Sequence, residues 1–221
     1  MGDEDLNAKL KAAAEKLVGG KALTSKYGID CFALVDKLLR NLGAATAADG
    51  DVAVTKDADY DWGDGILLDS IQPGDILQFH KHLVDVGTWK LANGKWYEAS
   101  GYTLTRPHHT AIVMEVRKDG SVVVVEQNVH PNPGNVTRNV IPRLEPGEET
   151  RVVNSEEKIK LKVSGEVHAY RPIPKPQKGA SLLHPARGGP RMANFAPSDG
   201  GAKRAPGSFG IEGRRDDEWP A

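Results

Sequence analysis

Residues 30–43, DCFALVDKLLRNLG, place a stripe of apolar side chains behind a cysteine, at the spacing of an α-helix. The stripe comprises Cys31, Leu34, Val35, Leu38, Leu39 and Leu42. Asp30 is a suitable N-cap and Gly43 a suitable stop signal. An earlier stripe over residues 6–17, followed by two glycines, predicts another helix. The chain is therefore predicted to open with two helices, the second carrying Cys31 at its first position and on its buried face.

After Pro73-Gly74 the pattern changes to alternating and β-branched residues, which is typical of strands. Strands are predicted at residues 75–80, 84–91, 95–103, 109–116, 122–128, 136–141 and 167–171. Asn93-Gly94 and Asp119-Gly120 are signals for tight hairpin turns. Helices followed by hairpin-linked strands indicate an α+β fold, with N-terminal helices packed on an antiparallel sheet of about six strands.

Composition limits the domain organisation and the class of protein. The chain has 221 residues, one cysteine and a net charge of −1, so it offers no basic field for nucleic acid and cannot form an internal disulfide. No apolar run approaches the roughly 20 residues of a membrane span. Residues 1–172 are predicted to form one domain, and the Pro/Gly-rich residues 173–221 a disordered tail. The acidic N-terminus predicts synthesis in the cytoplasm without a signal peptide.

Four polar residues could form a nucleophilic site. At a helix N-terminus, the dipole and backbone N–H groups favour a thiolate at Cys31, although a lone cysteine on an apolar stripe is more often a core residue. His109 lies on one predicted strand, and Glu126 and Asn128 share a face of the next strand. The turn at Asp119-Gly120 makes these strands neighbours. A thiolate, an imidazole and a carboxylate or amide together form a relay for nucleophilic catalysis.

Five segments carry a family resemblance. They are GIDCFALV (28–35), IQPGDIL (71–77), HHTAIV (108–113), DGSVVVVEQN (119–128) and GEVHAYRP (165–172). In this order they resemble the NlpC-type and CHAP (cysteine/histidine-dependent amidohydrolase/peptidase) proteins, which are papain-like cysteine peptidases. The resemblance spans roughly residues 24–172, and the joint pattern is more specific than any single segment.

The resemblance implies a papain-like fold, no cofactor and no metal. It makes Cys31 the nucleophile, His109 the general base and then acid, Glu126 the residue that orients His109, and Asn128 a supporting polar group. The family usually has a small residue after the nucleophile, where this chain has Phe32. We therefore expect Phe32 to reshape a substrate subsite.

A long acidic segment precedes the Pro-Gly-Asp motif, and its aromatic residues are candidates for substrate binding. Tyr60 and Trp62 stand among Asp59, Asp61 and Asp64. Long loops in compact domains are often functional, so these residues are predicted to line the substrate cleft, with a solvated surface loop as the alternative.

The activity implied is that of a cysteine peptidase or amidohydrolase that cleaves amide bonds in peptidoglycan stem peptides. The protein would then be a lysin or a secreted bacterial effector, exported by a specialised system or released by lysis. Its expected partners are peptidoglycan or another peptide, an immunity protein or a secretion-system component, and neither nucleic acid nor a membrane.

Two other functions fit the same residues. A metal-dependent amidase could use the cluster of His80, His82, His108 and His109, completed by Asp75 and Glu126. A papain-like scaffold could also bind a peptide without cleaving it.

Overall fold

The computed structural model describes residues 5–25, 30–49 and 60–175, which fold as α+β. Two helices, α1 (Leu6–Glu15) and α2 (Asp30–Asn41), precede the sheet. The strands are β1 (Asp64–Ile66), β2 (Ile76–Ala92), β3 (Lys95–Val116), β4 (Val122–Val129), β5 (Asn132–Ile141), β6 (Gly147–Asn154) and β7 (Glu157–Arg171). All pairs are antiparallel, in the order β1-β7-β2-β3-β4-β5, and β6 pairs with β7. The α+β prediction is confirmed.

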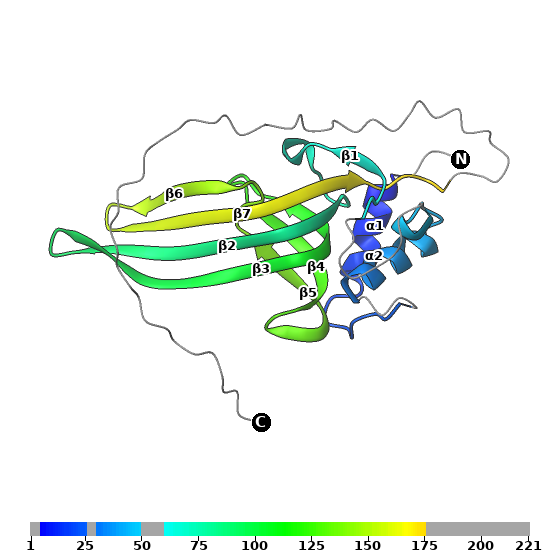
Figure 1. Ribbon diagram of the computed structural model, residues 1–221, viewed down its shortest axis with the longest axis horizontal. Coiled ribbons are helices and arrows are strands. Elements are labelled where there is room, and N and C mark those ends of the chain that lie inside the picture. The colour runs from blue at the N-terminus through cyan, green and yellow to red at the C-terminus, as the bar shows by residue number, and fades with distance from the viewer. Residues whose placement is uncertain (1–4, 26–29, 50–59, 176–221) are drawn as a thin grey trace, which may run out of the picture. The chain divides into compact units, whose positions relative to one another are not determined.

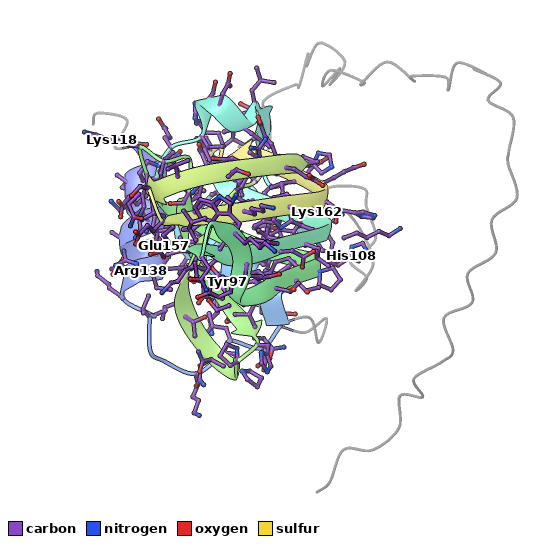
Figure 2. The ribbon with its side chains drawn as sticks, turned by 90° about the vertical axis from the view of Figure 1, so that its left-hand side faces the viewer. Tyr97, His108, Lys118, Arg138, Glu157 and Lys162 are labelled. Atoms are coloured by element: carbon purple, nitrogen blue, oxygen red, sulfur yellow. The ribbon has the colours of Figure 1, made fainter. Side chains whose placement is uncertain are left out.

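The helices pack at one end of the sheet, against β3 and β4, while the β2–β3 hairpin extends away from them (Figure 1). Viewed from the hairpin tip, Tyr97 and Glu157 lie on the near strands (Figure 2), and Tyr97 is half exposed. No helix in the described ranges is long and apolar enough to cross a membrane.

Helix α2 forms as the sequence predicts, with a boundary shift of one residue. It begins at Asp30, so Cys31 is its second residue and lies in the first turn. Gly43 ends it with φ +69°, and the Ala44 N–H donates to the Leu39 carbonyl oxygen in a Schellman-type cap. Leu34, Val35 and Leu39 of the apolar stripe are fully buried, so the stripe faces the sheet as expected.

Alternation along β4 places its valines in two cores. Val123 and Val125 pack with α2, whereas Val122 and Val124 pack on the opposite side of the sheet with Phe79. This two-sided burial explains the continuous valine run, because a strand buried on both faces has no polar side.

The predicted strands are shorter than the observed ones, and their boundaries differ. The predicted strands at 75–80 and 84–91 are one strand, β2 (Ile76–Ala92), and those at 95–103 and 109–116 are another, β3 (Lys95–Val116). The two are joined at Asn93-Gly94, where both residues have positive φ. Strands β1 and β6 and the first two thirds of β7, residues 157–166, are not predicted. Most of β6 is polar and exposed, so it carries no clear hydrophobic period.

The Pro-Gly-Asp motif joins three elements of the fold. Gly74 has φ +92°, and a Cβ there would lie 2.2 Å from the Asn7 carbonyl oxygen of α1. The buried Asp75 carboxylate accepts hydrogen bonds from Asn7 Nδ2 (2.6 Å), the Gln72 N–H (2.8 Å) and Arg171 Nε (3.1 Å). The motif thus links α1 to β2 and to the end of β7.

A β-bulge interrupts β2 near the middle of the sheet. Lys81 and His82 of β2 oppose only Gly165 of β7, and Lys81 has φ +50°. Beyond this point, the side-chain alternation of β2 is offset by one residue, and His82 packs on Phe79, three residues earlier, at 5.2 Å between ring centroids. Opposite Lys81, β3 carries Pro107, which has no N–H to pair.

The bulge requires glycine at position 165. Gly165 has φ +84°, and a Cβ would lie 2.1 Å from the Lys81 carbonyl oxygen, whereas Gly120 has φ +79° with nothing within 4 Å. We expect Gly120→Ala to lower the free energy of unfolding by about 1–2 kcal/mol from backbone strain alone. Gly165→Ala should cost about 1–3 kcal/mol more because of the added clash. Urea denaturation measures both, and equal losses would contradict this account.

Candidate active site

The structure brings Cys31, His109 and Glu126 together from three elements. Cys31 lies in the first turn of α2, His109 on β3 and Glu126 on β4. Backbone pairing of β3 with β4 covers only Ile112–Val116, so His109 and Glu126 lie just beyond the point where the two strands separate. His109 Nε2 lies 2.9 Å from Glu126 Oε2, and the thiol of Cys31 is hydrogen-bonded to the His109 ring. Nδ1 is therefore the ring nitrogen left to face the thiol.

The surroundings of Cys31 favour its thiolate. Burial raises the pKa of the thiol, but the hydrogen bond and positive charge of His109 lower it, as do the backbone N–H groups of Thr110 and Phe32. The net effect is a pKa below the ordinary thiol value. The Phe32 contribution depends on the position of Cys31 in the first turn of a helix, where backbone N–H groups lack helical partners.

His109 and Glu126 are buried and stabilise each other's charged forms. Burial lowers the pKa of His109, but hydrogen bonds and charge from Cys31 and Glu126 raise it to about 9. Burial raises the pKa of Glu126, but His109 and Arg106 bring it down to about 2. At neutral pH the site therefore holds an imidazolium and a carboxylate.

Sequence reasoning missed two further residues that bind Glu126. Arg106 donates from Nε to Oε2 at 2.8 Å and from Nη2 to Oε1. Asn139 of β5 donates from Nδ2 to Oε1 at 2.8 Å. Strict alternation along β3 puts Arg106 and His109 on opposite faces. Pro107 between them was the available signal, because proline within a strand indicates an edge or a bulge.

Asn128 is the next-to-last residue of β4, just before the turn to β5. Its φ is +60°, and the β4–β5 register shifts between Gln127 and Val129, so the alternation that predicts a shared face with Glu126 ends there. The exposed Asn128 side chain accepts a hydrogen bond from the Gly134 N–H at 3.1 Å. The neighbouring Gln127 bonds both backbone groups of Leu23, each at 2.8 Å, and thereby ties the segment before α2 to β4.

Phe32, Tyr60 and Trp62 form a buried aromatic cluster instead of an open cleft wall. Their ring centroids lie 4.9–5.7 Å apart, and all three side chains are at most 4% exposed. Trp62 Nε1 donates to Gln78 Oε1 (3.1 Å), which also accepts from the Thr110 hydroxyl (2.8 Å). The cluster thus supports α2 and β3 beside Cys31 and His109. The prediction that these three side chains contact the substrate does not agree with their burial.

Two of the three acidic residues near this cluster, Asp61 and Asp64, lie within the described residues. Asp61 accepts a hydrogen bond from the Tyr170 hydroxyl at 2.9 Å, and Asp64 begins β1. Asp59 lies outside the described residues.

The other histidines are distributed over different environments. The rings of His80 and His108 contact edge to face at 4.6 Å, while His82 is buried against Phe79, where burial lowers its pKa. Within residues 5–25, 30–49 and 60–175, no group of three or more His, Cys, Asp or Glu side chains is placed to hold a metal ion.

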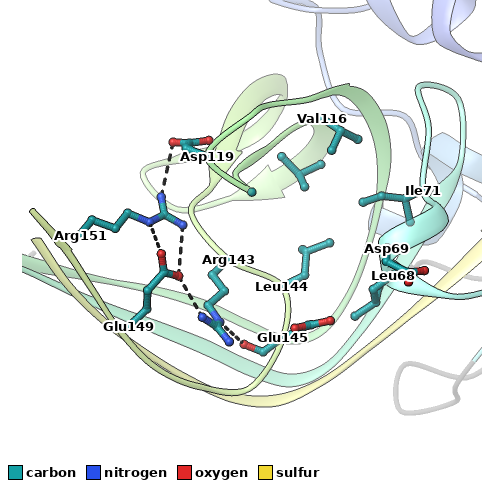
Figure 3. Close-up of a pocket in the computed structure, with 12 residues that line it drawn as sticks. Leu68, Asp69, Ile71, Val116, Asp119, Arg143, Leu144, Glu145, Glu149 and Arg151 are labelled. Atoms are coloured by element: carbon teal, nitrogen blue, oxygen red, sulfur yellow. Dashed lines mark hydrogen bonds and ion pairs between the residues drawn. The ribbon is translucent and has the colours of Figure 1, made fainter.

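One described cavity, of about 300 Å³, is shown in Figure 3, and its lining includes none of Cys31, His109 and Glu126. Leu68, Ile71 and Leu144 line its apolar side. Its other side is a chain of ion pairs that runs from Arg143 through Glu149 and Arg151 to Asp119.

Comparison with known proteins identifies the fold family. The family model of the AIM3/BBC1 cysteine proteinase-fold domain matches residues 8–181, which include Cys31, His109 and Glu126. No curated protein and no solved structure gives a significant match. The match supports the papain-like fold but not the narrower CHAP/NlpC type. The chain belongs to the family of AIM3/BBC1 cysteine proteinase-fold domains.

Proposed function

We propose that this domain is a cysteine-dependent hydrolase of amide bonds, with Cys31 as nucleophile, His109 as general base and acid, and Glu126 orienting His109. The observation that carries the proposal is a row of contacts in a cysteine proteinase fold, in which the Cys31 thiol is hydrogen-bonded to the His109 ring and His109 Nε2 lies 2.9 Å from Glu126 Oε2. The position of Cys31 in the first turn of a helix, its hydrogen bond to His109 and the charge of Glu126 favour a thiolate and an imidazolium, which are the reactive forms of such a pair.

The reaction would proceed in two steps. The Cys31 thiolate attacks the carbonyl carbon, and the backbone N–H of Cys31 helps to stabilise the oxyanion. His109 then gives its proton to the leaving amine, the C–N bond breaks and a thioester forms. In the second step His109 takes a proton from water, whose oxygen attacks the thioester. Release of the carboxylic acid restores the thiolate and the imidazolium.

The proposed substrate class is peptide amide bonds. Peptidoglycan stem peptides are the narrower candidate, and the support for them is the resemblance of segments such as residues 28–35 and 108–113 to CHAP and NlpC-type proteins.

The first experiment incubates the full chain with purified peptidoglycan sacculi and, separately, with a mixture of unstructured peptides, and identifies products by mass spectrometry. We expect new amide cleavage products with the wild type and none with Cys31→Ala, because the nucleophile is lost. Ser100→Ala, on the exposed hairpin, is the matched control. Cleavage of unstructured peptides alone would replace the peptidoglycan assignment, and equal cleavage by Cys31→Ala would refute the proposal.

A peptide-binding scaffold without turnover is the second candidate. The burial of the site favours it: the Glu126 side chain is fully buried and that of His109 is 8% exposed. An ordinary, unreactive thiol at Cys31 together with absent turnover would make this the better account.

Thiol reactivity gives a second prediction. Iodoacetamide should alkylate Cys31 well below pH 8.5, where an ordinary thiol is mostly protonated. His109→Ala removes the charge and hydrogen bond that lower the thiol pKa, so the acid limb of the rate profile should move up by about one unit or more. His168→Ala, an exposed histidine of β7, is the control. If the pH profile of alkylation is unchanged in both variants, the thiolate–imidazolium pair of Cys31 and His109 is contradicted.

Turnover should also decline on the alkaline side. The pKa of His109 is raised to about 9, so the imidazolium that protonates the leaving amine is lost as the pH rises through that value. The measurement is kcat against pH, and a constant kcat up to pH 10 would argue against His109 as the acid.

A further inference from the structure

Arg106 occupies an unusual position for a charged side chain. It is 4% exposed, and both its Nε and its Nη2 donate to the two oxygens of Glu126. Two parallel N–H···O bonds between a guanidinium and a carboxylate fix the plane of the carboxylate as well as its place. Arg106 therefore determines which oxygen of Glu126 faces His109.

The bulge in β2 explains how Arg106 reaches this place. Arg106 pairs with His82, and Phe79 pairs with His109, so β2 and β3 stay in register across the bulge. His82 packs on Phe79 because the alternation of β2 is offset after Lys81. Because Arg106 pairs with His82 and His109 pairs with Phe79, the side chain of Arg106 lies on the same side of the sheet as that of His109. It therefore shares the side of the sheet on which His109 and Glu126 meet.

The contact replaces missing backbone pairing. The β3–β4 ladder ends at Ile112 and Val125, and residues closer to the N-terminus of β3 have no β4 partner in the register. Beyond that point Arg106 and His109 both reach across to Glu126, and Asn139 approaches it from β5. Side chains thus hold the separating strands at the distance that the triad needs.

We infer that Arg106, assisted by Asn139, is a positioning residue of the active site, which acts on Cys31 through Glu126 and His109. This inference rests on the proposed function, and it adds a residue that acts through the carboxylate and not on the substrate. The charged or titratable groups that face this row are Cys31 from α2, His82 from β2, and Arg106 and His109 from β3.

The test measures iodoacetamide alkylation of Cys31 against pH in the full chain, with thermal unfolding to establish that each variant folds. Without Arg106, Glu126 loses its fork of donors and protonates at higher pH, so it no longer holds His109 as an imidazolium. We expect Arg106→Met to slow alkylation at pH 6 by at least fivefold and to move the acid limb upward. Arg106→Lys keeps the charge without the fork and should recover part of the shift.

Arg138→Met is the matched control, because Arg138 forms an exposed ion pair with Glu15, with both side chains 46% exposed. Its profile should equal that of the wild type. A folded Arg106→Met variant with the wild-type profile overturns the inference.

A double variant shows whether Arg106 acts through Glu126 and serves also if Arg106→Met alone fails to fold. Glu126→Gln and Glu126→Gln/Arg106→Met should give the same profile, because the carboxylate through which Arg106 acts is already gone. If the double variant is alkylated at pH 6 a further fivefold or more slowly than Glu126→Gln, the inference is overturned. A wild-type Cys31 that alkylates as an ordinary thiol refutes the proposed function itself, whatever the Arg106 variants show.

Discussion

The buried carboxylate of Glu126 is the constraint on which the site depends. A carboxylate that is removed from water needs hydrogen-bond donors around it, because the free-energy cost of burying it without them is large. Oε1 receives Arg106 Nη2 and Asn139 Nδ2, and Oε2 receives Arg106 Nε and lies beside His109 Nε2. These contacts come from β3 and β5 on either side of β4. The Glu126 carboxylate can thus receive all its hydrogen bonds only when β3, β4 and β5 are correctly placed. The ion pair with Glu126 then fixes the position of the His109 imidazole.

Asp75 applies the same principle to the scaffold. It is also a fully buried carboxylate, and its partners Asn7, Gln72 and Arg171 come from α1, the turn before β2 and the end of β7. Asp75 therefore links α1 to the start of β2 and the end of β7, whereas Glu126 positions the reactive residues. Both positions appear in the family-like motifs of the sequence, but only burial and contacts distinguish the structural carboxylate from the one in the site.

The features that sequence could predict depend on local periodicity. The α2 stripe, the turn at Asn93-Gly94 and the facing of Val122–Val125 follow from helical spacing, turn chemistry and alternation. Alternation failed where the backbone leaves regular geometry, at Lys81 and at Asn128, and these points decide the places of Arg106 and of the Asn128 side chain. Trp62 is predicted to line the substrate cleft because it stands in a long acidic segment, but its side chain is fully buried. Its burial depends on contacts with Phe32, 30 residues earlier, which no local pattern contains.

The charges of the site alternate along one row: Arg106 positive, Glu126 negative, His109 positive and Cys31 negative. Transfer of the proton from Cys31 to His109 leaves the sum at zero, because Arg106 and Glu126 already cancel. The free-energy cost of burying a group of charges is larger when the group carries a net charge than when adjacent opposite charges cancel. Without Arg106, the thiol–imidazole and thiolate–imidazolium forms would both carry one uncompensated negative charge. The guanidinium thus makes a largely buried thiolate compatible with a folded domain, since it neutralises the carboxylate that the imidazolium requires.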